Sequence, residues 1–232
     1  RPQVLFCADG RSVFKPLPYK HAFPMLEWGM NWCVARQVFD QLVFHAAAVE
    51  RGGRALLLAA PPESGKSTLC AALVAHGWRL LTDESTLWNL RRDELSGPAR
   101  PISLKNASID VIAECYPDAV LSERNCDTLK GTVAHLQPPL SSIERAGEPA
   151  QPRWLIFPRF RPGAKTLLAP RSPGEAFMEL AANGFNYGAL GRCAFRRTAD
   201  LISQVEAYDF VYSRLDEAME LFDELAADVV TN

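Results

Sequence analysis

The chain has 232 residues, of which 48% are hydrophobic and 22% charged, and its formal net charge is -2. This length suffices for one α/β domain with a well-filled core, and the composition is that of an ordinary globular protein. The near-neutral charge gives no overall attraction to nucleic acid or to an anionic membrane. No stretch alternates aromatic and basic residues, and no apolar run reaches the roughly 18 residues that span a bilayer. We therefore expect neither a nucleic-acid nor a membrane partner.

The six cysteines are widely spaced, without a C-x-x-C pair or a neighbouring histidine cluster. This spacing argues against a zinc site and against a dense disulfide framework. The first residues, Arg1-Pro2-Gln3, do not have the basic and then apolar pattern of a signal peptide. We expect reduced, mostly buried thiols in a cytoplasmic protein.

Residues 1–53 form an N-terminal zone, in which we predict strands over 3–7 and 42–49 and a helix over 30–41. The zone ends at Gly52-Gly53, which separates two apolar runs and is typical of a hairpin turn. We therefore expect strand 42–49 to lie antiparallel to the strand that follows.

Residues 54–90 form a strand, loop, helix, strand unit. Strand 55–60 is apolar throughout, as expected of a central strand, and the helix over 66–76 ends at Gly77. A short strand over 79–82 has Asp83 and Glu84 at its carboxyl end. We expect this strand to be the parallel neighbour of strand 55–60, which would bring both acids beside the loop.

The remaining chain is a continuation of the same single domain, 1–232. Residues 137–152, where prolines lie among polar residues, predict a mobile loop. A strand follows over 154–157, and Ser172-Pro173-Gly174-Glu175 predicts a capping box that opens a helix to Ala182. The final helix is predicted over 213–229, with an acidic outer face.

The loop "APPESGKST", from Ala60 to Thr68, has the pattern of a phosphate-binding P-loop. Such a loop points successive backbone N–H groups at the phosphates, while its lysine reaches the outer phosphates and its hydroxyl binds Mg²⁺. Pro61 and Pro62 lack N–H groups, but they precede the half of the loop that donates. We expect ATP and Mg²⁺ to bind here, with nucleotide contacts from Glu63, Ser64, Gly65, Lys66, Ser67 and Thr68.

Two acids follow the loop closely, because Asp83 is only 17 residues beyond Lys66 and Glu84 is next to it. One such carboxylate can hold Mg²⁺ while the other accepts the proton of an attacking hydroxyl. We predict a metal site at Ser67 and Asp83; the alternative is a turn with two exposed acids. His45, on the strand that pairs with the loop strand, is a further candidate, although a lone histidine in a strand is more often a core residue.

The segment "HAAAVERGGRALLLAAPPESGKSTLCAALVAHGWRLLTDE" resembles the catalytic core of HPr kinase/phosphorylase, the bacterial enzyme that phosphorylates a serine of the phosphocarrier HPr. In that family a histidine stands 21 residues before the P-loop lysine, a glycine ends the next helix, and an Asp-Asp pair follows the lysine by 17 and 18 residues. His45, Gly77 and Asp83-Glu84 occupy these positions around Lys66.

The resemblance implies a P-loop kinase fold of the HPr kinase and PEP carboxykinase type, with a mixed central β-sheet flanked by helices. It also implies a catalytic group in which Lys66 binds phosphate, Ser67 binds Mg²⁺, Glu84 is the general base and His45 is the active-site histidine. The family's second signature, which supplies a further metal ligand, is replaced by "RPISLKN" at 100–106. A phosphorylase activity is therefore not expected to follow from the resemblance.

Four segments, "EWGMNWC", "RPISLKN", "FPRF" and "FNYGALG", resemble the HPr-kinase-related kinase A group. Members of that group occur beside a PqqD-like small protein, so the resemblance implies a partner of that kind. HPr kinases are hexamers, so the resemblance implies that this chain can form a homo-oligomer.

Phosphoryl transfer also needs cations beyond the loop lysine, and Lys105 and Arg159 are the candidates for substrate or phosphate binding. The leading hypothesis is an ATP-dependent kinase that phosphorylates serine or threonine of a protein or peptide. The alternatives are a small-molecule kinase of the short P-loop type and an ATP-binding switch module that transfers nothing.

Overall fold

The computed structural model describes residues 2–227. Its centre is an eight-stranded sheet in the order β14-β15-β13-β6-β5-β8-β9, with β7 paired to β5 off this path. β13 runs parallel to β6 and to β15, and the other pairs are antiparallel, so the sheet is mixed, as expected. Its strands are β5 (Gln41–Arg51), β6 (Arg54–Ala59), β7 (Arg79–Thr82), β8 (Ser85–Asn89), β9 (Leu95–Ser96), β13 (Gln151–Phe160), β14 (Leu167–Pro170) and β15 (Glu206–Tyr212).

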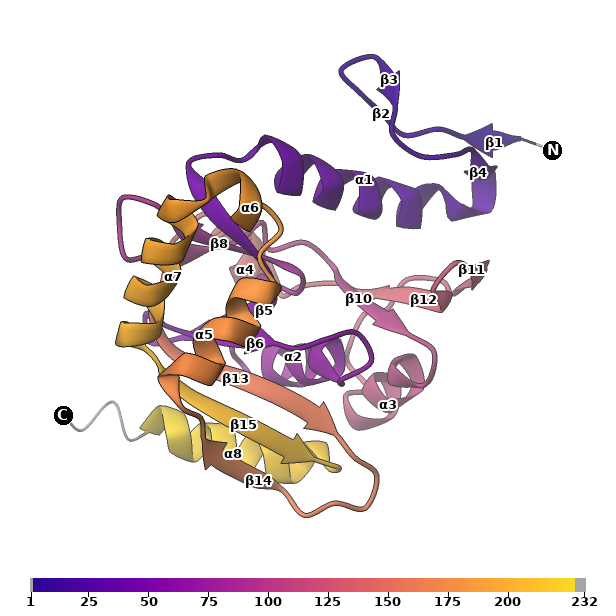
Figure 1. The fold of residues 1–232 in the computed structure, drawn as a ribbon. Helices are drawn as coiled ribbons and strands as arrows, with labels where there is room; N and C mark the ends of the chain where they lie inside the picture. The colour runs from indigo at the N-terminus through magenta and orange to yellow at the C-terminus, as the bar shows by residue number, and fades with distance from the viewer. Residues whose placement is uncertain (1, 228–232) are drawn as a thin grey trace.

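Helices cover both faces of this sheet, which confirms the expected α/β class (Figure 1). Along β6, Leu56 and Leu58 point to one face while Leu57 and Ala59 point to the other, because side chains alternate along a strand. The first face carries α2 (Lys66–Ala75), α3 (Ala107–Cys115) and α8 (Leu215–Ala227), and the second carries α5 (Pro173–Ala182), α6 (Tyr187–Leu190) and α7 (Arg192–Gln204).

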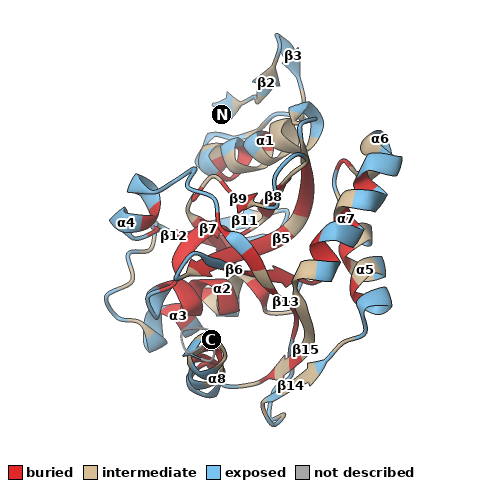
Figure 2. Ribbon diagram, turned by 90° about the vertical axis from the view of Figure 1, so that its left-hand side faces the viewer, coloured by how far each residue is buried: buried red, intermediate tan, exposed pale blue. Residues whose placement is uncertain are grey.

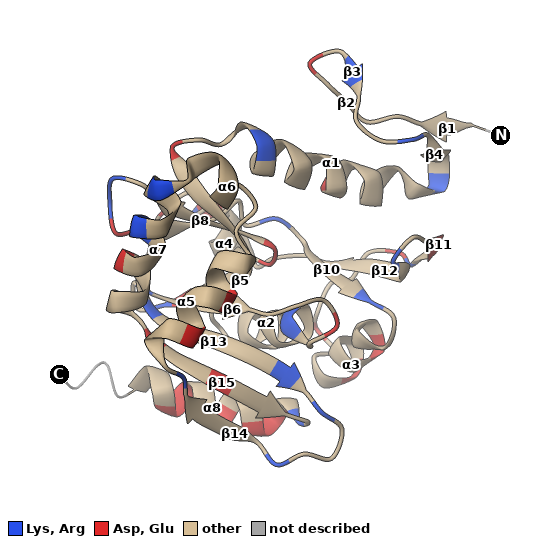
Figure 3. Ribbon diagram, in the orientation of Figure 1, with Lys and Arg blue, Asp and Glu red and all other residues tan. Residues whose placement is uncertain are grey.

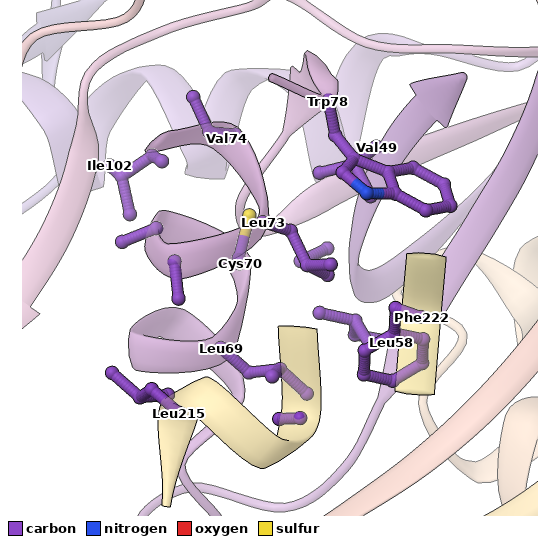
Figure 4. Packing of buried hydrophobic residues seen from close by; sticks show 14 of the residues in the cluster. Val49, Leu58, Leu69, Cys70, Leu73, Val74, Trp78, Ile102, Leu215 and Phe222 are labelled. Atoms are coloured by element: carbon purple, nitrogen blue, oxygen red, sulfur yellow. The ribbon is translucent and has the colours of Figure 1, made fainter. Parts of the chain in front are cut away.

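Helix α2 is fixed by the core on the first face. Figure 2 shows that buried residues concentrate in the central strands and along α2. Burying one leucine side chain contributes about 1.5–3 kcal/mol, so this core holds the helix, and the loop before it, in one place. Figure 4 shows the packing of Leu69, Cys70, Leu73 and Val74 of α2 among Val49, Leu58, Trp78, Ile102, Leu215 and Phe222.

The N-terminal zone differs from its prediction. The expected strand over 3–7 is wrong, because the chain bends there into two small antiparallel pairs, β1 (Gln3–Val4) with β4 (Leu17–Pro18) and β2 (Cys7–Ala8) with β3 (Arg11–Ser12). A short 3-10 turn, η1 (Tyr19–His21), leads into α1 (Ala22–Gln37). The helix therefore begins and ends earlier than the predicted 30–41.

The end of α1 has a clear cause in the loop that follows α5. The amide of Asn186 donates to the carbonyls of Val38 and Gln41, at 2.9 Å each, and its Oδ1 accepts from the N–H of Val43 at 2.9 Å. These bonds hold residues 38–43 in an extended path that enters β5. A side chain 143 residues further along the chain thus decides where the helix stops.

A separate three-stranded antiparallel sheet lies beside α2 and α3, made of β10 (Ile102–Lys105), β12 (Gly131–Leu136) and β11 (Asn125–Thr128). The expected loop over 137–152 is wrong in part, because it contains helix α4 (Leu140–Glu144). The hydroxyl of Ser142 accepts from the N–H of Leu80 at 3.0 Å, and Arg79 donates to the carbonyls of Arg145 and Glu148 at 3.1 Å each. The segment is thereby tied to β7.

Two local predictions are confirmed. Gly52 and Gly53 both have positive φ angles, 60° and 80°, and connect β5 to β6 in antiparallel register. The hydroxyl of Ser172 accepts from the N–H of Glu175 at 3.4 Å, with Pro173 at the first helical position of α5. The predicted final helix is present as α8, while Val229, assigned to it from the sequence, lies outside the described residues.

The cysteines are all free, but the expectation that most are buried is wrong. Cys70 is buried in α2, and Cys33 is partly buried. The remaining four, Cys7, Cys115, Cys126 and Cys193, are exposed. Within residues 2–227, no helix is both long enough and apolar enough to cross a membrane.

Candidate functional site

The loop after β6 presents unpaired backbone donors. Positive φ angles at Glu63 (66°) and Gly65 (88°) turn the backbone, and α2 begins at Lys66. Within residues 2–227, none of the N–H groups of residues 63–68 donates to a protein acceptor. Six successive free amides at a helix N-terminus form a setting that favours an anion.

The shape of the loop depends on Gly65. The hydroxyl of Tyr212, on β15, donates to its carbonyl oxygen at 2.9 Å, and the N–H of Phe160 donates to the carbonyl of Ser64 at 2.9 Å. A β-carbon at Gly65 would clash with the Tyr212 hydroxyl and lie 2.9 Å from Cβ of Phe160. Two strand ends, those of β13 and β15, therefore close around the loop.

The lysine of the loop is nearly buried, with 8% of its surface exposed, and its Nζ donates to the carbonyl of His45 at 3.5 Å. Burial lowers the pKa of Lys66 to about 8, against the opposing charges of Glu84 and Asp83. The Oγ of Ser64 is also buried and has no hydrogen-bond partner within residues 2–227. A lysine and a hydroxyl without strong partners, beside free amides, are suited to phosphate oxygens.

The strand that carries the two acids is not the neighbour of β6, so that expectation is wrong. β5 lies between them and is antiparallel to both, since Ala48 pairs with Leu57 of β6 and with Thr82 of β7. The Gly52-Gly53 hairpin places β5 on one edge of β6 and β13 occupies the other, so the strand after α2 pairs with the outer edge of β5. β6 and β7 remain parallel to each other, one strand apart, so the loop and the acids still lie at the same end of the sheet.

The two acids occupy different environments. Asp83 is buried, and its Oδ2 accepts from the N–H of Ser103 on β10 at 2.9 Å. Burial, and then the negative charge of Glu84, raise the pKa of Asp83 to about 7. Glu84 is more accessible, with 22% of its side chain exposed, and its Oε2 accepts from Nδ2 of Asn31 at 2.5 Å. The alternative of a turn with two exposed acids does not hold for Asp83.

His45 lies at an irregularity of β5, where it and Ala46 both pair with Ser85. Bulges of this kind re-aim a side chain and are common beside active sites. Its Nε2 is 3.7 Å from Oε1 of Glu84, and its ring stacks on Phe185 with centroids 5.3 Å apart. Burial, followed by the charges of three lysines, lowers the pKa of His45 to about 4, so the imidazole is neutral at pH 7; the lysines are Lys66, Lys105 and Lys130.

The structure thus brings His45, Lys66, Asp83 and Glu84 together. Lys105, the last residue of β10, is exposed, and its charge lowers the pKa values of both His45 and Lys66. Arg159 is exposed at the end of β13, next to the residue that bonds Ser64, and no ion pair involves it within residues 2–227. Figure 3 shows basic positions on α2, β10 and β13 on the same side of the molecule.

Two polar side chains of the site were not predicted. Asn31, on α1, contacts Glu84, and its Oδ1 accepts a hydrogen bond from Arg100. Both residues lie in segments quoted for the kinase A resemblance, "EWGMNWC" and "RPISLKN", and Phe185 lies in a third, "FNYGALG". The resemblance of all three segments to the same family was the signal that could have pointed to these residues. The sequence did not show that the segments lie together, which only the fold does.

Comparison with known proteins gives little. No protein-family model matches the chain, and no curated protein matches it. Among solved structures, the HPr(Ser) kinase/phosphatase from Coxiella burnetii is similar with 11% sequence identity and a TM-score of 0.33, over 80% of this chain and 98% of that one. This is a distant similarity.

Proposed function

We propose that the chain is an ATP-dependent kinase that transfers the γ-phosphoryl group to a hydroxyl of serine or threonine in a protein or peptide. One observation carries the proposal: a loop with six free amides and a buried lysine faces two carboxylates of different environment across a single strand. Phosphoryl transfer needs mainly positioning and charge neutralisation, which such a site supplies.

The nucleotide side is built from the loop. The amides of residues 63–68 and Nζ of Lys66 would hold the phosphates, and Ser67 with Asp83 would hold Mg²⁺. Mg²⁺ in such sites takes one or two carboxylates together with phosphate oxygens and water, so this donor set fits it. The metal would neutralise charge on the phosphates, and it would also offset the negative charge of Glu84, which disfavours ionised Asp83.

The acceptor side is built around Glu84. Its partly exposed carboxylate can accept the proton of the acceptor hydroxyl while that oxygen bonds to the γ-phosphorus and the bond to the β-phosphate oxygen breaks. His45 is neutral at pH 7 and adds no positive charge that would compete for the carboxylate. The resemblance on the sequence favours a small PqqD-like protein, or a substrate of the same system, as the partner.

The proposal is tested with γ-labelled ATP added to a lysate of the host and to proteins encoded nearby. Wild-type protein is compared with Lys66→Ala, Glu84→Gln and the control Glu114→Gln, whose carboxylate is exposed on α3. We expect a labelled polypeptide with wild type and the control, none with Lys66→Ala, and a rate lower by about 10²–10⁴ with Glu84→Gln at unchanged ATP affinity.

The other outcomes separate the alternatives. A labelled small molecule would favour a small-molecule kinase. ATP binding without any transfer would favour a switch module. Transfer at the wild-type rate by Glu84→Gln would remove Glu84 from the role of base.

A further inference from the structure

The carboxylate of Glu84 accepts a hydrogen bond from a side chain in a distant part of the sequence. Asn31, on α1, donates from Nδ2 to Glu84 Oε2 at 2.5 Å. Its Oδ1 accepts from the guanidinium of Arg100 and lies 3.5 Å from Oγ of Ser85. Since arginine can only donate, the oxygen of the amide must face Arg100, and the nitrogen must then face Glu84.

The position of α1 is fixed by other contacts on the same side of the helix. Glu27, one turn before Asn31, lies with its Oε2 3.1 Å from Nε2 of His135 on β12, and both side chains are largely buried. The ring of Phe23 meets His135 edge-on at 4.6 Å, and Nζ of Lys130 lies 5.2 Å from the ring centre of Trp28. Asn31 is therefore brought to Glu84 by a docked helix.

The charge of Arg100 strengthens the hydrogen bond between Asn31 and Glu84. A hydrogen bond from a cation to the amide oxygen polarises the amide, and its N–H groups become better donors to a carboxylate. Two other donors of Arg100, Nε and Nη1, are buried without an acceptor within residues 2–227. The guanidinium therefore reaches Glu84 through its hydrogen bond to Asn31, while its charge also favours ionised Asp83.

We infer that Asn31 is a positioning residue, which holds the Glu84 carboxylate in the orientation needed to take the proton of the acceptor hydroxyl. The inference rests on the proposed function, because it gives Glu84 its task. It adds α1 and Arg100 to the active site that was proposed from the loop and the acidic pair.

The test uses three variants of the whole chain. Asn31→Asp has nearly the same shape and keeps the acceptor for Arg100, but it cannot donate to Glu84. Asn31→Ala removes both bonds, and Met30→Ala, a neighbouring exposed side chain on α1, is the matched control. Measured are kcat and KM for ATP in transfer from labelled ATP to the acceptor found above, together with the melting temperature.

We expect Asn31→Asp and Asn31→Ala to lower kcat by about 10- to 100-fold, because a misplaced base loses its alignment with the hydroxyl. KM for ATP should stay within about twofold of wild type, and Met30→Ala should leave both constants within about twofold, as expected of a surface substitution. In a Glu84→Gln background, Asn31→Ala should cause no further loss. A wild-type kcat for Asn31→Asp, or equal losses in both backgrounds, overturns the inference while the kinase itself stands.

Failure of the proposed function is recognised separately. If the wild-type chain transfers no phosphoryl group, the melting temperatures of Asn31→Ala, Glu84→Ala and the double variant still report on the pair, because alanine leaves no acceptor for the Asn31 amide. If the melting temperature of the double variant falls by less than the sum of the two single decreases, the hydrogen bond between Asn31 and Glu84 is supported. Additive decreases show that Asn31 does not hold the carboxylate, and they overturn the inference.

Discussion

Nε2 of His45 lies 3.7 Å from Oε1 of Glu84, and the imidazole is neutral at pH 7 because burial and nearby lysines lower its pKa to about 4. In the unfolded chain a histidine titrates near pH 6.5. The contribution of His45 to stability is therefore complete above pH 6.5 and is lost as the pH falls toward 4. Between pH 7.5 and 4.5, the free energy of unfolding should fall less in His45→Gln than in the wild type, with a difference of up to about 3 kcal/mol between the two proteins. Urea unfolding at both values measures this, and identical losses for the two proteins would contradict the lowered pKa.

The second prediction concerns the backbone of the loop. Gly65→Ala adds a β-carbon at φ 88° in contact with Tyr212 and Phe160, so we expect it to cost about 1–3 kcal/mol of stability and to abolish ATP binding. Gly163→Ala is the matched control, since Gly163 also has a positive φ, 72°, but has open space around it. The control should lose some stability and keep its ATP affinity in calorimetric titration. Equal affinities of both variants would show that the closure by Tyr212 and Phe160 is not needed.

The third prediction concerns Asn186, whose side chain bonds the backbone between α1 and β5. Asn186→Ala leaves the buried N–H of Val43 and the partly buried carbonyls of Val38 and Gln41 without their partners. A buried unpaired group costs about 1–3 kcal/mol and a partly buried one less, so we expect a loss of about 2–4 kcal/mol in the free energy of unfolding. Urea denaturation measures it, with Asn125→Ala as a control, because the partly buried Asn125 donates a single long hydrogen bond, 3.5 Å, to the carbonyl of Glu123. A loss below about 1 kcal/mol would mean that water replaces these bonds.

The fourth prediction concerns the buried ion pair between Arg79 of β7 and Glu50 of β5, whose side chains are 6% and 4% exposed. Arg79→Met leaves the buried Glu50 with the more distant and half-exposed Arg145, at 3.7 Å, as its ion-pair partner, and it frees two carbonyls of the 145–148 segment. We therefore expect a loss of about 3 kcal/mol, at the lower end of the range for a broken buried pair. The double variant Arg79→Met, Glu50→Gln should recover part of that loss, because no uncompensated charge remains. Thermal unfolding of the single and double variants checks this, and additive losses would contradict the pairing.

Local structure was largely predictable where a short pattern decides it. The Gly52-Gly53 hairpin and the capping box at Ser172 follow from backbone freedom and from one hydroxyl, and neither needs information from elsewhere in the chain. The grouping of Lys66 with Asp83 was also predictable, because Lys66 opens the helix after one strand and Asp83 follows the next strand of the same continuous unit.

The remaining features depend on contacts between distant segments. The position of β7 depends on β5 and β13, which together occupy both edges of β6. The segment 137–152, with its helix, is held to β7 by the bond between Ser142 and Leu80, 62 residues away. Asn31 and Glu84 are 53 residues apart, so no local pattern connects them. Pairing of this kind is a property of the folded chain.

The strand between β6 and β7 sets a distance as well as an order. Two interstrand spacings of about 4.8 Å separate the backbone that leads into the 60–65 loop from the backbone that leads into the acids by roughly 10 Å. Directly adjacent strands would halve this separation. With β5 in the middle, the strand that carries His45 and its register irregularity runs between the strand of the loop and the strand of the acids, so a third side chain can reach the same end of the sheet.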